Sequence, residues 1–233
     1  AAHQDLLQPQ KVLTPRPHRL TQKTKYSHYD PDVRTDEIKH VIDLLTKARV
    51  CFPVVRSHCN GIPLNAEADE KSFKLLFLDV GLANHILGLK WRSIQDMTDT
   101  GLVNKGGLAE QFIGQHLLNL GDGKQTPELH YWLREGKANN AEVDYAIARN
   151  GRIYPVEVKA GKSGSLKSLH QFLQQKDSRF AFRFDLNPPA RQELETALRV
   201  SGTRSQTKQV AYSLISLPLY AVEEISRLCG QID

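Results

Sequence analysis

Two carboxylates and a lysine, Asp144, Glu157 and Lys159, stand close together in the stretch EVDYAIARNGRIYPVEVKAG. Mg²⁺ and Mn²⁺ prefer hard oxygen ligands, usually one or two carboxylates together with water and substrate phosphate. A lysine beside such an ion can orient an attacking water and offset the charge that develops at phosphorus. These residue types therefore predict metal-dependent phosphodiester chemistry, provided that the fold brings them together.

A β-hairpin would bring them together. The Asn-Gly dipeptide at 150–151 predicts a two-residue type I′ turn, because that turn needs positive φ at both central positions. The resulting register places Asp144 opposite Glu157, and Lys159 on the same strand face as Glu157. Opposed carboxylates repel each other, so a cation is expected to compensate them. Pro155 donates no ladder hydrogen bond, and a bulge there would shift the pairing by one residue.

Strict alternation along the two strands predicts which side chains point into the core. The residues expected on the core side are Val143, Tyr145, Ile147, Val156 and Val158. The opposite, polar face has an alternative interpretation as a solvated surface, on which Glu142 pairs with Lys159 and the two carboxylates merely tolerate each other. Helices predicted before and after the hairpin argue against it, because they should cover the sheet.

The elements predicted around this hairpin alternate between helix and strand. Hydrophobic periodicity and helix-capping residues predict helices at about 36–49, 80–89, 106–120 and 165–175, and another after Pro218. Strands are expected at 50–55, 73–78, 129–133, 142–148, 153–160, 179–186 and 210–217. This order predicts an α/β (α+β) fold, in which helices flank a mixed sheet.

The chain is expected to divide into three parts. Residues 1–24 contain three prolines and no sustained apolar period, which indicates a disordered lead-in. Residues 25–92 have the helix, hairpin and helix outline of a winged-helix-like module, which many small α+β units share. The polar segment that follows is the candidate boundary, so that 93–233 form the second unit.

The composition is that of an ordinary globular chain. Hydrophobic residues make up 40% and charged residues 24%, and no apolar run is long enough for a membrane helix. Three cysteines, spaced neither as a disulfide framework nor as a zinc site, favour a reducing compartment. We therefore expect a soluble, cytoplasmic protein. The net charge of +5 permits contact with a polyanion without requiring it.

The Asp strand, the turn and the Glu157-Val158-Lys159 strand resemble the PD-(D/E)xK nuclease superfamily, which has the restriction-endonuclease-like fold. A closer likeness is to a domain of unknown function that follows the P-loop in a large prokaryotic family of predicted AAA-type ATPases. It covers roughly residues 25 to 229. The segments that carry it include FKLLFLDVGL, GGLAEQF, HYWLREGKANNAEVDYAI and YPVEVKAG.

The resemblance implies a role for each matching residue. Asp144 and Glu157 would be ligands of Mg²⁺ or Mn²⁺, Glu110 would be a further acidic ligand, and Lys159 would be the catalytic lysine. From its position alone, Glu110 is equally well a surface glutamate of a helix. Three residues after the motif are candidates for contact with nucleic acid: Lys162, Lys167 and Gln171.

The expected activity is hydrolysis of DNA phosphodiesters. The chain lacks a GxxxxGK[ST] phosphate loop, so we expect no ATP hydrolysis and interpret it as a fragment or a paralogue of an AAA-type ATPase. An alternative is a catalytically inactive nuclease-fold module that binds DNA or a protein partner and regulates an ATPase, upstream or in trans. A third is an antitoxin or defence-system component that acts through protein contacts.

Overall fold

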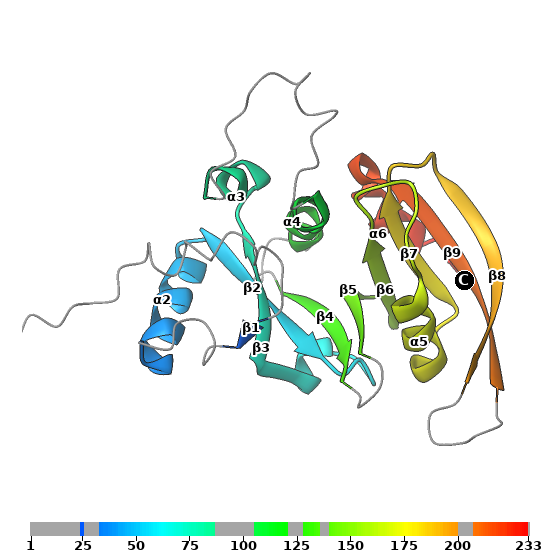
Figure 1. The fold of residues 1–233 in the computed structure, drawn as a ribbon, viewed down its shortest axis with the longest axis horizontal. Coiled ribbons are helices and arrows are strands. Elements are labelled where there is room, and N and C mark those ends of the chain that lie inside the picture. Colours follow the sequence, from blue (N-terminus) through cyan, green and yellow to red (C-terminus); the bar gives the residue numbers. More distant parts are fainter. Residues whose placement is uncertain are drawn as a thin grey trace, which may run out of the picture.

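The computed structural model describes residues 24–25, 33–86, 105–120, 128–135, 140–199 and 207–232. Within these residues, nine strands form one mixed sheet in the order β1-β3-β2-β4-β5-β6-β7-β9-β8 (Figure 1). The strands are β1 (Thr24–Lys25), β2 (Cys51–Ser57), β3 (Ala68–Phe77), β4 (Leu129–Arg134), β5 (Ala141–Arg149), β6 (Arg152–Val158), β7 (Phe180–Asp185), β8 (Ala190–Arg199) and β9 (Thr207–Pro218).

Helices cover both faces of this sheet, which confirms the expected α+β class. The helices are α2 (Thr35–Lys47), α3 (Val80–Ile86), α4 (Lys105–Leu118), α5 (Lys167–Lys176) and α6 (Glu224–Cys229), with 3₁₀ turns η2 (Leu64–Glu67) and η4 (Leu219–Ala221). None of the helices in the described ranges is long and apolar enough to cross a membrane.

Alternation along the strands separates the two faces. In β3, Leu76 joins the core beneath α4 and α6, whereas Phe77 joins the core beneath α2. In β7, Phe182 packs in the α4 core and Ala181 packs against α5. α4 and α6 therefore share one face, and α2 and α5 cover the other. The sheet core is apolar on both sides, as expected for a sheet between two helical layers.

The strands of the expected winged-helix-like part belong to the same sheet as the rest of the chain. β2 pairs parallel with β4, beginning with Val54 opposite Leu129, and β3 pairs antiparallel with β2. The proposed boundary near residue 93 lies in 87–104, and nearly all of the predicted lead-in lies in 1–23. Both are outside the described residues, so the division into domains stays a prediction.

β8 was not expected from the sequence. It pairs antiparallel with β9 from Ala190 opposite Ser216 to Arg199 opposite Thr207. Its segment, ARQELETALR, carries polar and charged side chains, and those that are described are mostly exposed. An edge strand with few buried side chains lacks the apolar alternation that predicts strands, which explains why the sequence pattern did not indicate it.

Candidate functional site

The hairpin between β5 and β6 has the predicted turn, and the predicted register from Arg149 to Tyr145. The expected pairing of Asp144 with Glu157 is not part of this ladder. Asn150 and Gly151 have positive φ angles of 49° and 75°, as the type I′ turn requires. Arg149 pairs with Arg152 next to the turn, and the register continues unshifted through Pro155. The proline therefore causes no bulge in the β5–β6 ladder.

The two strands part at the predicted carboxylates. Their ladder ends with Tyr145 opposite Val156, and beyond that point β5 continues beside β4 while β6 continues beside β7. We call this divergence the fork. The side chain of Asp144 lies in it, where Oδ2 accepts a hydrogen bond of 2.7 Å from the backbone N–H of Val158. The carboxylate of Asp144 thus accepts a hydrogen bond from a backbone N–H group that lies beyond the end of the β5–β6 ladder.

A bulge in β5 determines how Asp144 is presented. The pairing with β4 shifts there, so that Asp144 and Tyr145 together oppose Tyr131. Val143 consequently packs with the residues near α5, whereas Tyr145 packs in the core beneath α4. The expectation that Val143 and Tyr145 share a face is wrong, because strict alternation does not hold across a bulge.

A buried lysine lies among the carboxylates. Lys74, on β3, is 1% exposed, and its Nζ lies 2.7 Å from Glu142 Oε1, 3.5 Å from Glu110 Oε2 and 4.0 Å from Asp144 Oδ1. Burial lowers the pKa of Lys74, but the three carboxylates raise it more, so that its pKa is higher than usual and the ammonium group stays charged. Its Nζ also lies 5.2 Å from the ring centroid of Tyr131.

Lys74 was not among the residues predicted as functional from the sequence. The signal for it was a lysine inside the apolar segment FKLLFL, since a lysine is rarely fully buried unless it is paired. That segment does not show which residues pair with Lys74, because Glu110 and Glu142 lie on elements that are distant in the chain.

Glu157 and Lys159 form a second ion pair at the fork. Lys159 Nζ contacts Glu157 Oε1 directly. Glu157 is 4% exposed, and its other oxygen, Oε2, has no hydrogen-bond partner in the described part of the chain. Burial and the charge of Asp144 raise the pKa of Glu157 to about 8, against the opposing effect of Lys159. Burial also raises the pKa of Asp144. The raised pKa values reflect the cost of burying these carboxylates, which a further cation would offset.

Glu110 reaches the same cluster from α4. Its backbone carbonyl accepts a hydrogen bond of 2.8 Å from the hydroxyl of Tyr145, and its charge contributes to the raised pKa of Glu157. The helix approaches β5 closely because residue 114 is a glycine. A Cβ atom at Gly114 would lie only 2.5 Å from Tyr145 Oη. The structure thus brings together all four residues predicted for catalysis, Glu110 and Lys159 among them.

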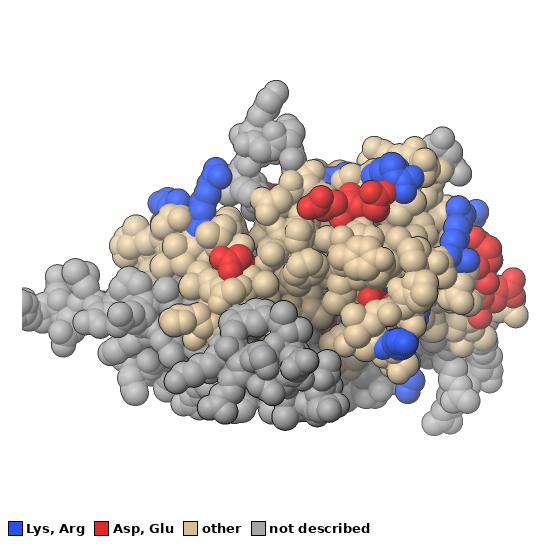
Figure 2. All heavy atoms as spheres, turned by 90° about the horizontal axis from the view of Figure 1, so that it is seen from above, with Lys and Arg blue, Asp and Glu red and all other residues tan. Residues whose placement is uncertain are grey.

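The three residues predicted to contact nucleic acid lie on or near α5. Lys162 and Lys167 are exposed. Gln171 accepts a hydrogen bond of 3.0 Å from Arg134, so it is engaged within the protein. Figure 2 shows lysine and arginine side chains in small separate groups over the described part of the face in view. The contact with DNA stays a prediction.

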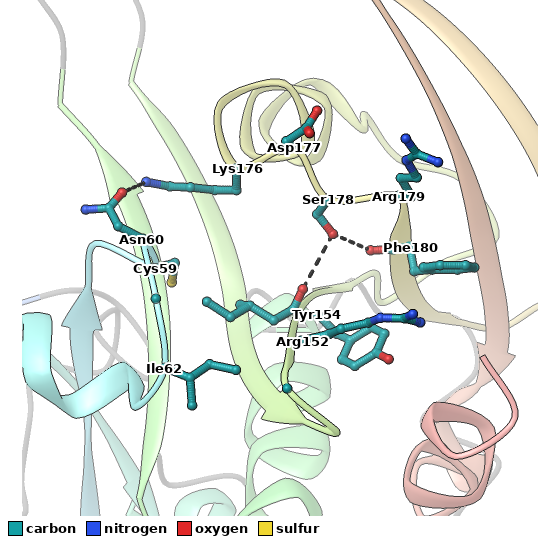
Figure 3. Close-up of a pocket in the computed structure, with 13 residues that line it drawn as sticks. Cys59, Asn60, Ile62, Arg152, Tyr154, Lys176, Asp177, Ser178, Arg179 and Phe180 are labelled. Carbon is teal, nitrogen blue, oxygen red and sulfur yellow. Dashed lines mark hydrogen bonds between the residues drawn. The ribbon is translucent and has the colours of Figure 1, made fainter. Parts of the chain in front are cut away.

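A separate pocket of about 690 Å³ lies at the opposite end of β6, beside the hairpin turn (Figure 3). Arg152, Lys176 and Arg179 contribute cations to its lining, and Asp177 contributes a carboxylate. Lys176 Nζ donates a hydrogen bond to Asn60 across the pocket. None of these residues was predicted as functional from the sequence.

Glu110, Glu142, Asp144 and Glu157, which we call the acidic cluster, do not form a preformed metal-binding group. In the ranges that the structure describes, no set of three or more His, Cys, Asp or Glu side chains is arranged to hold a metal ion. The carboxylates of the cluster instead surround two ammonium groups, those of Lys74 and Lys159.

Comparisons with known proteins identify two regions. Residues 1–93 match a domain of unknown function (DUF8612), and residues 105–202 match another (DUF4143). Neither description names a nuclease. No curated protein and no solved structure matches the chain. The region that matches DUF4143 thus includes Glu110, Glu142, Asp144 and Glu157.

Proposed function

We propose that this chain is a metal-dependent nuclease-like protein that hydrolyses DNA phosphodiesters at the fork. The observation that carries this proposal is the convergence of the largely buried Asp144 and the buried Glu157 beside Lys159. Buried carboxyls with raised pKa values and a specific charge partner are typical of functional sites, because stability alone does not favour them. Glu157 Oε2 in particular is a buried acceptor that lacks a donor within the described residues.

The residues at the fork suit Mg²⁺ or Mn²⁺. Asp144 and Glu157 offer hard carboxylate oxygens, and Glu110 is near enough for its charge to affect the pKa of Glu157. A divalent cation held by these residues would supply the partner that Glu157 Oε2 lacks. When bound, such a cation activates water and neutralises charge on a phosphate.

The chain's own side chains have distinct tasks in this proposal. The hydrogen bond from Val158 N–H orients the carboxylate of Asp144. Lys159 holds Oε1 of Glu157 and thereby fixes a carboxylate whose second oxygen, Oε2, is buried without a hydrogen-bond partner among the described residues. Lys159 would also stabilise negative charge on the attacked phosphate, as preorganised cations do.

A second candidate is a catalytically inactive module that binds DNA or a protein partner and regulates an ATPase. The position of Lys74 favours it, because a cation already lies within 4.0 Å of three carboxylates. A cluster whose negative charge is partly offset by its own lysines can persist as a structural element without any metal. The fold alone does not distinguish these functions.

Cleavage assays test the proposal. Purified protein would be incubated with supercoiled plasmid or single-stranded DNA in Mg²⁺, Mn²⁺ or EDTA. We expect metal-dependent nicking that falls by roughly 10²- to 10³-fold in Glu157→Gln and Lys159→Met, a range typical for loss of one charge-stabilising group. Glu195→Gln, at an exposed glutamate of β8, is the control. DNA binding without cleavage under all conditions would contradict the nuclease and favour the inactive module.

A further inference from the structure

The cluster around Lys74 is built for a cation. A buried ammonium group is costly unless its charge is paired and hydrogen-bonded. Lys74 is 1% exposed, and its three carboxylate neighbours are Glu110, Glu142 and Asp144. Carboxylate oxygens are also the ligand type that a divalent ion prefers, so the ammonium group occupies the space between three carboxylates that such an ion would have to enter.

The charge balance of the whole cluster is informative. Glu110, Glu142, Asp144 and Glu157 supply four carboxylates, and the two lysines supply two ammonium groups. With every group ionised, two negative charges remain, which one divalent cation neutralises. Removal of the charge at Lys74 would leave three negative charges and space among its former partners. Nuclease sites with two metals hold them about 3.5 to 4 Å apart between shared carboxylates.

We propose that the ammonium group of Lys74 is a built-in cation that excludes one divalent ion from the Glu110, Glu142 and Asp144 side of the cluster. The inference concerns the site of the proposed function and rests on that function only for the class of ion. Asp144 joins the two sides, since its Oδ1 faces Lys74 and its Oδ2 accepts the Val158 N–H.

The cation and the carboxylates come from different regions of the chain. Lys74 lies on β3, within the region that matches DUF8612, and the carboxylates lie within the region that matches DUF4143. The side chain reaches the cluster across the sheet, over the ring of Tyr131 on β4. The N-terminal region therefore completes the site and sets how many ions it accepts.

Metal titration of the full chain tests this inference. Mn²⁺ would be titrated calorimetrically into wild-type protein, Lys74→Met and Lys71→Met. Lys71 is an exposed lysine on the same strand and serves as the matched control. We expect Lys74→Met to bind one more Mn²⁺ per chain than wild type, and Lys71→Met to bind the same number. Mn²⁺ should also raise the thermal midpoint of Lys74→Met more than that of wild type.

The outcomes separate this inference from the proposed function. One ion on wild type and one of equal affinity on Lys74→Met would overturn the inference and leave the function standing. No ion on wild type but one on Lys74→Met would support the inference and contradict the function. No ion on either protein would overturn both.

Wild-type protein gives a result that does not depend on how the variant folds. Electron paramagnetic resonance of the Mn²⁺-saturated wild type should show isolated ions. A spectrum of two interacting ions, lost in Asp144→Asn, would overturn the inference even if Lys74→Met did not fold.

Discussion

The two ends of the β5–β6 hairpin differ in ways that their sequences only partly reveal. At the turn, the backbone is regular and cations line an open pocket, among them Arg152 and Lys176. At the fork, β5 is bulged, the charge of Glu157 is buried, and that of Asp144 is largely buried. Exposed charges contribute little to stability, whereas buried charges must be compensated. Changes to the charges at the fork should therefore affect the stability of the fold more than changes to the charges at the turn.

Removing the buried cation should have the largest effect. Lys74→Ala leaves three carboxylates without their shared partner, so the free energy of unfolding of the metal-free protein should fall by about 3 to 5 kcal/mol. Lys176→Ala, at the turn-end pocket, should change it by less than about 1 kcal/mol. Urea denaturation measures both. Equal effects of the two substitutions would remove the contrast between the ends.

Titration of Glu157 should make stability depend on pH. Its pKa is about 8 in the folded protein against an ordinary value of 4.5. The folded state therefore binds more protons than the unfolded state between these values, and its stability is lost as pH rises through that window. We expect a decline of up to about 1.4 kcal/mol per pH unit in metal-free protein. Glu157→Gln should lack this component in denaturation curves at several pH values, and identical curves would contradict the assignment.

The close approach of α4 can be tested with a methyl group. A Cβ at Gly114 would overlap Tyr145 Oη and lie 2.6 Å from Leu76 Cδ1, so Gly114→Ala should destabilise the protein by about 1 to 3 kcal/mol. Gly106, in the same helix, has no atom within 4 Å of the added Cβ and provides the control. Thermal denaturation compares the two. A neutral Gly114→Ala would mean that Glu110 does not depend on this packing.

The smallest expected effect lies at the turn. Gly151 has a φ of 75°, which costs an L-residue about 1 to 2 kcal/mol. Gly151→Ala should therefore lower the free energy of unfolding by that amount without altering metal binding at the fork. Gly161→Ala is the comparison, because an added Cβ there meets no atom within 4 Å. Loss of metal binding in Gly151→Ala would show that the two ends are coupled.

The features that were predicted correctly from the sequence depend on residues that are neighbours in the chain. The Asn-Gly turn and the register through Pro155 follow from backbone preferences of adjacent residues. The bulge at Asp144 and the buried position of Lys74 do not, because both depend on strands distant in the chain. Edge strand β8 was missed for the opposite reason, since it buries too little to show a pattern. The sequence thus indicated carboxylates of the candidate site but not Lys74, the cation that lies among them.

Calorimetric titration of Mn²⁺ into the full chain at about pH 8.5 tests the central claim most directly. At that pH Glu157 is largely ionised in the folded protein. The account predicts saturable binding that is lost in Asp144→Asn and in Glu157→Gln and is retained in Glu195→Gln. Absence of saturable binding to the wild type, or equal binding to all four proteins, would contradict a divalent-metal centre at the fork.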